Sequence, residues 1–407
     1  MKNYYLLSNG RLRRHDNTLV MENADGQKKP IPVEDVDSLY LYGEVDLNTK
    51  ALTFLSSKKI PLHVFNYYGF YSGSYYPREY LHSGYLLVHQ VKHYTDEAHR
   101  LLLVRELVRA SAHSMLRNVA YYSNRGKAAA GAGKNESEED REPTGEIGTE
   151  QALEPAVPQD ADLEAIIDAS AIQPVLPDGA ASMPSDNDPA NDPLESSLLF
   201  DDKVSPLALL RATITDLAAL IDRQQQINEL RGIEGKMRER YYQAWQHIIG
   251  GEWTFDRRVR RPPDNEVNAL ISFGNSVIYT ACLSEIYRTQ LTPTISYLHE
   301  PGARRFSLAL DLSEIFKPLL VDRAIFRLLN TGQLKPEHFD RSLGGCYLTD
   351  AGKRLYLGAL EERLNATIKH RRLGRHVSYR HLIRLECYKL IRHLTDVEAY
   401  HAFRAWW

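Results

Sequence analysis

The run "ISYLHEPGARRFSLALDLSEIFKPLLVDR" at residues 295–323 decides how the second half of this chain folds. Apolar residues recur through it with helical spacing and surround two carboxylates, Asp311 and Glu314. Side chains three residues apart project from one face of a helix, with Cβ atoms about 5–6 Å apart. The apolar neighbours are Leu308, Leu310, Leu312, Ile315 and Phe316. We therefore predict a helix whose two acidic groups share one side, in surroundings too apolar for an ordinary solvated face.

The sequence around this run is also helical in character from Ser205 onward. Apolar residues keep helical spacing within residues 207–221 and again within residues 267–282. Prolines divide this half into separate helices, at Pro262, Pro263, Pro293, Pro301 and Pro318. We expect residues 205–407 to form an all-α domain.

The first ninety residues have a different pattern, rich in Tyr, Val and Leu. Short apolar runs such as "DSLYLYG" and "IPLHVFN" are separated by turn residues at intervals of roughly ten residues. This spacing favours an antiparallel β-sandwich-like domain over residues 1–90. The period becomes helical from Gly84, and we assign residues 91–126 to a connecting helix. The predicted fold class is therefore α+β.

Residues 127–204 differ from both domains, with many Ala, Gly, Pro, Ser, Asp and Glu and almost no aromatic residues. Between Lys127 and Lys203 there are 19 acidic and 4 basic side chains, so we expect an acidic, disordered insertion. The other parts of the chain carry 46 basic and 34 acidic side chains, although the net charge of the whole chain is −3. This surplus suits a polyanionic partner, but many proteins of similar charge bind no nucleic acid.

Composition also indicates where the protein works. No stretch approaches the roughly 18 consecutive apolar residues of a membrane-spanning helix, and no signal peptide is visible. Cys282, Cys346 and Cys387 are too widely spaced for a zinc motif or a disulfide framework. We expect a cytoplasmic protein.

The carboxylates indicate a possible metal site. Two carboxylates in an apolar neighbourhood raise each other's pKa unless a cation or a hydrogen-bond donor compensates them. Mg²⁺ prefers oxygen ligands, and one added imidazole shifts the preference toward Mn²⁺. Candidates are His299, at the start of a His-Glu-Pro-Gly turn, and Glu234, which we place between Gly232 and Gly235 near the beginning of a helix. Each residue also has a purely structural explanation. His299 could be a core or capping residue, as a lone His more often is. Glu234 could be stabilised by unpaired backbone N–H groups at a helix start.

Three segments taken together are more specific. They are the Glu-Gly step at Glu234, the run "RPPDNEVNALISFG" beginning at Arg261, and the run from His299 to Arg323. Together they resemble the C-terminal domain of the CRISPR-associated integrase often called Cas protein one. The resemblance implies a β domain followed by an α-helical catalytic domain. It also implies that Glu234, His299 and Glu314 hold Mg²⁺ or Mn²⁺, and that Asp311 lies beside the metal.

The activity implied by the resemblance is spacer integration. The 3′-hydroxyl of a short double-stranded DNA fragment attacks a phosphodiester at the edge of a CRISPR repeat. Homodimers and a complex with a small ferredoxin-like partner, Cas protein two, are implied as well. Basic and polar residues beside the three segments are the candidate DNA contacts. They are Arg238, Arg240, Tyr241, Arg257, Arg258, Arg260, Arg261, Asn268, Arg304, Arg305 and Lys317.

Two other functions stay open on the sequence. One is a non-catalytic scaffold that binds DNA ends while partners cut and join the strands. The other is a general, structure-selective, metal-dependent nuclease for which integration is incidental. Loss of strand transfer in acid-site variants separates an enzyme from a scaffold, and products at the repeat edges separate an integrase from a nuclease.

Overall fold

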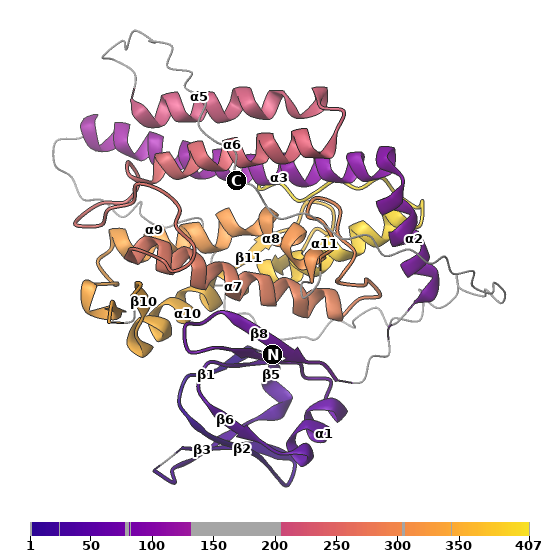
Figure 1. Ribbon diagram of the computed structural model, residues 1–407, viewed down its shortest axis with the longest axis vertical. Helices are drawn as coiled ribbons and strands as arrows, with labels where there is room; N and C mark the ends of the chain where they lie inside the picture. The colour runs from indigo at the N-terminus through magenta and orange to yellow at the C-terminus, as the bar shows by residue number, and fades with distance from the viewer. Residues whose placement is uncertain are drawn as a thin grey trace. The chain divides into compact units, whose positions relative to one another are not determined.

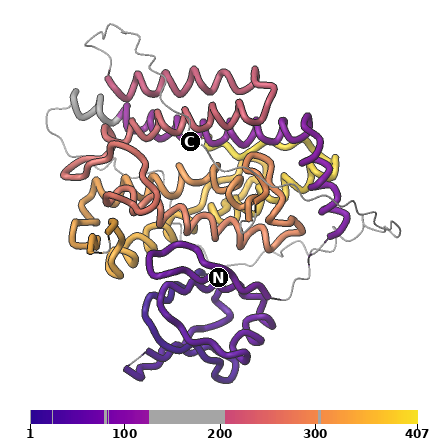
Figure 2. Tube along the Cα trace, in the orientation of Figure 1, coloured from indigo at the N-terminus to yellow at the C-terminus, as the bar shows by residue number. Residues whose placement is uncertain are grey.

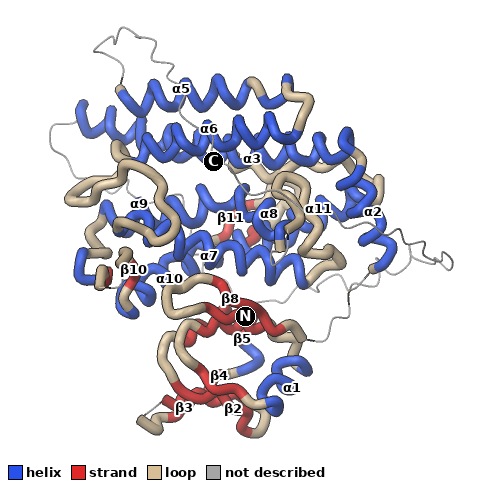
Figure 3. The backbone as a smooth tube through the Cα atoms, in the orientation of Figure 1, coloured by secondary structure: helices blue, strands red, loops and turns tan. Residues whose placement is uncertain are grey.

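A computed structural model of the chain describes residues 2–23, 25–77, 81, 83–131, 205–302, 306–342 and 344–406. In these residues the longer strands lie in the N-terminal part and helices make up most of the remainder (Figure 3). The predicted α+β class is confirmed. From position 132 onward, the predicted acidic insertion lies outside the described residues.

Two four-stranded sheets form the N-terminal part (Figure 1). The first has the order β1 (Lys2–Leu6), β5 (Val36–Leu41), β7 (Leu62–Phe65) and β8 (Tyr71–Tyr75). The second has the order β4 (Lys28–Ile31), β3 (Thr18–Asn23), β2 (Gly10–His15) and β6 (Val45–Leu47). A 3₁₀ turn, η1 (Val33–Asp35), precedes β5, and helix α1 (Thr49–Ser57) precedes β7. Residues from both sheets and α1, among them Leu12, Leu39 and Phe54, share one apolar core.

The predicted antiparallel pairing is wrong for part of both sheets. Strands β1 and β5, β5 and β7, and β2 and β6 pair in parallel. Parallel neighbours need a connection that carries the chain back to the same edge, and α1 is such a connection between β5 and β7. The apolar runs show that strands exist, but they do not report the direction of a partner that is distant in the sequence.

The remaining chain is built mainly from helices. α2 (Gly84–Thr95) and α3 (Glu97–Gly131) lead out of the sheets. They are followed by α5 (Pro206–Ala219), α6 (Ile227–Trp245), α7 (Glu266–Tyr287), α8 (Ser307–Lys317), α9 (Arg323–Asn330), α10 (Asp350–Asn365) and α11 (Tyr379–Leu394). Short 3₁₀ turns occur at η2 (Ile221–Arg223) and η4 (Pro336–His338).

The predicted all-α character of this half needs a correction. Two small hairpins interrupt the helices: β9 (Phe339–Asp340) pairs with β10 (Tyr347–Leu348), and β11 (Thr367–Lys369) pairs with β12 (His376–Ser378). Strands of two or three residues are too short to show a period of two in the sequence.

Local side chains set several helix starts. Ser83, Ser205, Asn265, Thr349 and Ser378 each precede a helix and accept a backbone N–H of its first turn. Such caps satisfy donors that have no partner inside the helix. These boundaries therefore follow from residues that are adjacent in the sequence.

Helix α7 lies at the centre of the helical part, where α8 and α11 pack against it. Among the described residues, α7 is the one helix that is both long enough and apolar enough to cross a membrane. The mean hydropathy of its most apolar 18 residues is 1.2. In the fold, however, 83% of this 18-residue stretch is buried inside the protein. Its apolar surface therefore belongs to the core.

Helices α3, α5 and α6 lie side by side, and the C-terminal segment runs back along α3 (Figures 1 and 2). The backbone N–H of Ala402 donates to Glu106 of α3, and His113 of α3 contacts the carbonyl of Ala405 at 2.7 Å. Residues far apart in the sequence thus fix the position of α3.

Helix α8 continues into α9 through a π-turn, η3 (Pro318–Asp322). The turn begins at Pro318, which has no backbone N–H to donate to the helix. Single π-turns of this kind are frequent at functional sites. Ser114 and Asn118 of α3 donate to the backbone carbonyls of Ile315 and Pro318 at 3.2 and 2.7 Å. These bonds hold α8, with its two carboxylates, against α3.

A buried ion-pair network joins the sheets to the helices. Asp37 of β5 accepts hydrogen bonds from Arg288 at 2.6 Å and from Arg380 at 2.9 Å. Arg380 also donates to Glu361, which faces Asn3 of β1. Removing one partner of such a network typically costs about 3–5 kcal/mol, because the other charge stays buried without compensation.

Candidate active site

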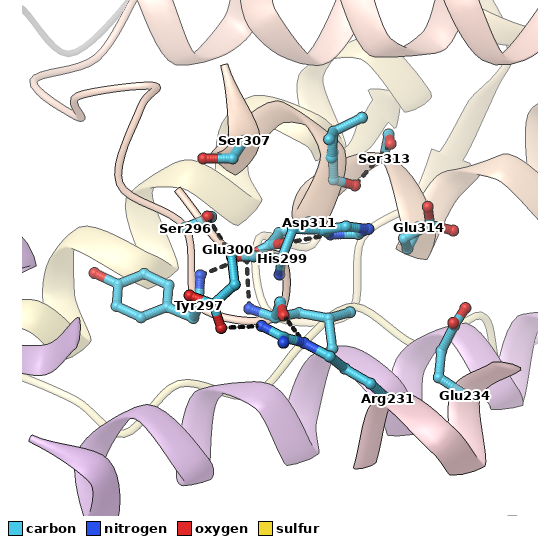
Figure 4. A network of polar contacts seen from close by, with 12 residues as sticks. Arg231, Glu234, Ser296, Tyr297, His299, Glu300, Ser307, Asp311, Ser313 and Glu314 are labelled. Carbon is cyan, nitrogen blue, oxygen red and sulfur yellow. Dashed lines mark hydrogen bonds and ion pairs between the residues drawn. The ribbon is translucent and has the colours of Figure 1, made fainter. Parts of the chain in front are cut away.

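Asp311 of α8 organises the turn that carries His299 (Figure 4). Its fully buried carboxylate accepts hydrogen bonds from the backbone N–H groups of Tyr297, Leu298 and His299 at 2.7, 2.9 and 3.0 Å. The same carboxylate lies 2.8 Å from Nδ1 of the His299 ring. A ring nitrogen that faces a carboxylate carries the proton, so the lone pair of the neutral ring is on Nε2. The ring is thus oriented to offer Nε2 as a ligand.

Two arginines and a tyrosine that the sequence did not predict as site residues hold the same turn. Arg231 of α6 and Arg100 of α3 donate to backbone carbonyls beside His299 at 2.7 and 2.8 Å. Both guanidinium groups also reach Glu300, which accepts a further hydrogen bond from Tyr94 of α2. Burial raises the pKa of Glu300, but these donors outweigh it and lower the pKa to about 2. Glu300 is adjacent to His299 in the sequence, whereas Arg100 has no local signal.

Glu234 lies in the middle of α6, so its predicted place near a helix start is wrong. The capping box of Gln226 and Glu229 sets the start earlier, and the helix continues through both glycines beside Glu234. Gly232 and Gly235 are exposed, and a Cβ added at either would meet nothing within 4 Å. The backbone on both sides of Glu234 is therefore open to a large ligand.

Arg238 joins the carboxylates of two helices. Its Nη2 lies 2.6 Å from Oε1 of Glu234 on α6 and 2.5 Å from Oε2 of Glu314 on α8. The other oxygen of Glu314 accepts from Lys317 at 2.5 Å. Burial raises the pKa of Glu314, but Arg238 and Lys317 outweigh it and hold the pKa well below its usual range. Glu314 is thus ionised, and both carboxylates are paired with side-chain cations.

The three residues predicted as metal ligands lie on α6, α8 and the turn between α7 and α8. Glu234 and Glu314 share Arg238, and the charge of Glu314 acts on the pKa of His299. Figure 4 shows both glutamates on one side of the His299 ring. Two carboxylates and one imidazole suit Mg²⁺ or Mn²⁺ as donors.

In the present arrangement, side-chain cations neutralise Glu234 and Glu314. Among the described residues, no three His, Cys, Asp or Glu side chains are close enough to hold a metal ion without moving. A guanidinium nitrogen bonds a carboxylate oxygen at 2.6 Å here, whereas Mg²⁺ binds oxygen at about 2.0–2.1 Å. The donor atoms of these residues are therefore of the kind that Mg²⁺ or Mn²⁺ binds. A metal ion can reach the carboxylates only if Arg238 leaves its position between them.

The candidate DNA contacts separate into several groups. Arg240, Arg257, Arg260 and Arg261 are exposed. Arg238 and Lys317 are engaged with the acidic residues described above. Arg304 and Arg305 lie outside the described residues. The exposed arginines are the members of the set that can reach a phosphate as they stand.

The prediction of a DNA contact is wrong for Tyr241. Its side chain is fully buried, and its hydroxyl donates to Asp322 at 2.9 Å and lies 2.8 Å from Nδ2 of Asn118, which donates to it. Burial raises the pKa of Asp322 to about 7, although Tyr241 and nearby cations lower it. Tyr241 therefore belongs to a polar network inside the fold.

Asn268 is also buried, and it shapes the arginine-rich loop at residues 257–264 instead of facing solvent. Its Oδ1 accepts from the backbone N–H of Val259 at 3.1 Å and from Arg258 at 2.9 Å. Its Nδ2 donates to the carbonyl of Arg257 at 3.0 Å and to Asp264 at 2.7 Å. Arg258 further donates to Ser272 on α7. A direct DNA contact by Asn268 is thus wrong, and Arg258 is turned toward the protein.

Comparison with known proteins identifies the family. The family model described as CRISPR associated protein Cas1 matches residues 4–151 and 201–362. The chain belongs to the Cas1 family. A CRISPR-associated endonuclease Cas1 of Moorella thermoacetica is 41% identical over 407 residues, and one of Thermodesulfovibrio yellowstonii is 38% identical, with 100% of each chain covered in both cases. The resemblance found in the three sequence segments is thereby confirmed.

Solved Cas1 structures have the same fold. A CAS1 protein from Thermotoga maritima superposes with a TM-score of 0.71 at 34% identity, covering 99% of this chain and 100% of that one. A casposase bound to integration product gives a TM-score of 0.71 at 17% identity, covering 98% and 92% of the two chains. A chain of a Cas6-RT-Cas1–Cas2 complex gives 0.67 at 15% identity, covering 98% of this chain and 36% of that one. The last two, at such low identity, show a shared fold alone.

Proposed function

We propose that this Cas1 family member is a metal-dependent DNA integrase of CRISPR adaptation. It inserts short double-stranded DNA into a repeat array by transesterification. The 3′-hydroxyl of the fragment attacks a phosphodiester of the repeat, a new phosphodiester forms as the old P–O bond breaks, and the displaced repeat strand leaves with a 3′-hydroxyl. The observation that carries the proposal is the pairing of Glu234 and Glu314 through Arg238, on one side of a His299 ring that Asp311 orients. Support also comes from relatives named endonucleases and from the shared fold of a casposase bound to integration product.

The residues of the site divide the work. Oxygens of Glu234 and Glu314 and Nε2 of His299 would hold Mg²⁺ or Mn²⁺, while Asp311 keeps the ring in the right tautomer. When bound, such an ion polarises the phosphoryl group and lowers the pKa of the attacking hydroxyl. Arg231 and Arg100 fix the turn around His299, so the imidazole keeps its position while DNA enters.

DNA is held through its phosphates in this proposal. The exposed side chains of Arg240, Arg257, Arg260 and Arg261 supply the positive charge, and Asn268 orders the loop that carries three of them. The protein works as a homodimer together with Cas protein two. A complex whose name includes Cas2 contains a chain of the same fold, which supports the partner assignment.

A plasmid assay tests the reaction. Supercoiled plasmid carrying a repeat is incubated with short DNA fragments, Mg²⁺ or Mn²⁺ and the small partner, and junctions are sequenced. We expect junctions at the repeat edges for the wild type and none above background for Glu234→Ala and His299→Ala. Glu239→Ala, an exposed glutamate on the same helix, is the matched control and should retain the activity.

The two rival functions give different results in the same assay. A non-catalytic scaffold would leave strand joining unchanged in Glu234→Ala and His299→Ala. A general nuclease would lose activity in these variants, but its products would be nicks and breaks without junctions at the repeat edges. Either result would contradict the proposal.

A further inference from the structure

We infer that Arg238 is a displaceable counter-ion, which pairs Glu234 with Glu314 before a metal ion binds and turns to a DNA phosphate afterwards. The inference rests on the proposed function and adds a role for a residue that was expected only to contact DNA. It makes metal loading and DNA binding depend on each other through one side chain.

The contacts place Arg238 between the two carboxylates. Its Nε and Nη2 lie 2.8 and 2.6 Å from Oε1 of Glu234, and Nη2 lies 2.5 Å from Oε2 of Glu314. Nη2 also lies 3.4 Å from the hydroxyl of Ser111 on α3. The side chains of Glu234, Glu314 and Arg238 are only 19, 10 and 16% exposed. The guanidinium therefore neutralises two shielded carboxylates at once.

The same position cannot hold Arg238 and a metal ion together. An ion that binds both carboxylates must approach their oxygens to about 2.0–2.1 Å, and Nη2 already lies between those oxygens. Lys317 takes the other oxygen of Glu314 but makes no contact with Glu234 among the described hydrogen bonds and ion pairs. Arg238 is therefore the cation that has to leave.

Charge then decides where Arg238 goes. Glu234 and Glu314 are balanced by Arg238 and Lys317, so a divalent ion adds two positive charges to a shielded site. A guanidinium without an anion in such surroundings is unfavourable. A phosphate offers paired acceptor oxygens that match the guanidinium fork. The open backbone at Gly235 leaves room on this side of α6 for a phosphate to approach.

Metal binding to the full-length protein tests the first half of the inference. Mn²⁺ affinity is measured by isothermal titration calorimetry, without DNA, for wild type, Arg238→Gln and Arg238→Lys. We expect Arg238→Gln to bind Mn²⁺ about tenfold more tightly, because a competing charge is removed, with Arg238→Lys in between. Lys236→Gln removes an exposed cation on the same helix and should leave Mn²⁺ affinity unchanged. Equal or weaker Mn²⁺ affinity in Arg238→Gln overturns the inference.

DNA binding tests the second half. Fluorescence anisotropy with a short duplex should show that Mn²⁺ strengthens DNA binding severalfold in the wild type and much less in Arg238→Gln. The same gain in both proteins overturns the phosphate role. If Arg238→Gln does not fold, as judged by its thermal unfolding, Arg238→Lys decides both measurements, because a lysine cannot bridge the two carboxylates as a fork.

A further variant separates the inference from the proposed function. Glu234→Gln should abolish Mn²⁺ binding at the site. If the wild type binds Mn²⁺, Glu234→Gln does not, and Arg238→Gln equals the wild type, then only the inference fails. If neither the wild type nor Arg238→Gln binds Mn²⁺, the metal centre of the proposed function fails together with it.

Discussion

The carboxylate of Asp311 lies 2.8 Å from Nδ1 of His299 and also accepts the backbone N–H of that residue at 3.0 Å. One buried group thus sets both the backbone and the ring of the histidine. A carboxylate behind an imidazole fixes its tautomer and makes the other nitrogen a stronger ligand. Asp311 therefore acts through His299, and the sequence spacing of twelve residues between them gives no hint of the contact.

Replacing Asp311 by Asn should weaken metal binding about 10- to 100-fold. The amide can accept through its oxygen, but its NH₂ group would face backbone N–H donors at Tyr297 and Leu298. The free energy of unfolding should also fall by roughly 1–3 kcal/mol. Mn²⁺ calorimetry and urea unfolding measure the two effects. Asp216→Asn, on an exposed part of α5, is the control, and wild-type Mn²⁺ affinity in Asp311→Asn would contradict the role of the pair.

Metal affinity should depend on pH through His299. Burial lowers the pKa of His299, but the hydrogen bond and charge of Asp311 outweigh it and raise the pKa above the ordinary 6.5. A metal ion needs the neutral ring, so Mn²⁺ affinity should fall up to about tenfold per pH unit below the raised pKa. The stability of the fold depends on pH in the opposite direction. The stabilisation that His299 contributes is complete below pH 6.5 and is lost as pH rises through the raised pKa of His299.

Mn²⁺ titrations between roughly pH 5 and 9 check this expectation. His299→Gln binds Mn²⁺ more weakly and should lose most of the pH dependence over this range. An unchanged pH profile in the variant would show that another group controls the affinity.

Asp322 should make the protein less stable at alkaline pH. Burial raises the pKa of this carboxyl to about 7 in the folded state, from an ordinary 3.8. Its contribution to stability is therefore complete below pH 3.8 and is lost as pH rises to about 7. Asp322→Asn removes the ionisation and should be more stable than the wild type above pH 7, by on the order of 2–4 kcal/mol.

Urea unfolding at acidic and alkaline pH measures the difference. Tyr241→Phe removes a donor that favours the ionised carboxylate, so it should increase the loss of stability at high pH. A stability difference between Asp322→Asn and wild type that does not change with pH would refute the prediction.

We expect Gly235 to leave room for DNA beside Glu234 and not to stabilise the fold. It is exposed in the middle of α6, and an added Cβ meets nothing, so Gly235→Ala should raise the free energy of unfolding by about 1 kcal/mol. If DNA approaches the backbone beside Glu234, the same change should reduce integration severalfold. Gly358→Ala, in an equally open position of α10, should give the stabilisation without the loss of activity. Normal integration by Gly235→Ala would show that the glycine serves another purpose.

The exposed arginines of the loop at residues 257–264 should bind DNA through phosphates. Changing Arg257, Arg260 or Arg261 to Gln should weaken binding of all sequences alike and reduce the slope of log affinity against log salt by about 1 for each contact. Arg13→Gln, exposed on strand β2, is the control. A loss confined to particular sequences would point to base recognition, and an unchanged slope would exclude these side chains.

Local sequence determined many elements of the fold. The apolar period at residues 207–221 and 267–282 predicts helices that the structure contains as α5 and α7. The apolar run around Asp311 and Glu314 likewise predicts the buried helix α8. These features were predictable because caps and periodicity act between residues a few positions apart. The direction of strand pairing was not predictable, since β1 pairs with β5, a strand that is distant from it in the sequence.

The sequence by itself determined which acidic and imidazole groups this protein carries and that Asp311 and Glu314 share a buried helix. Only the tertiary structure decided their partners: Asp311 holds the His299 turn, while Glu314 reaches across to Arg238 of α6. It also turned Tyr241 and Asn268 inward and left the loop arginines exposed. The physical reason is that attraction between charges depends on their distance in space. Packing of α6 and α8 against α3 sets the distance between these charged groups.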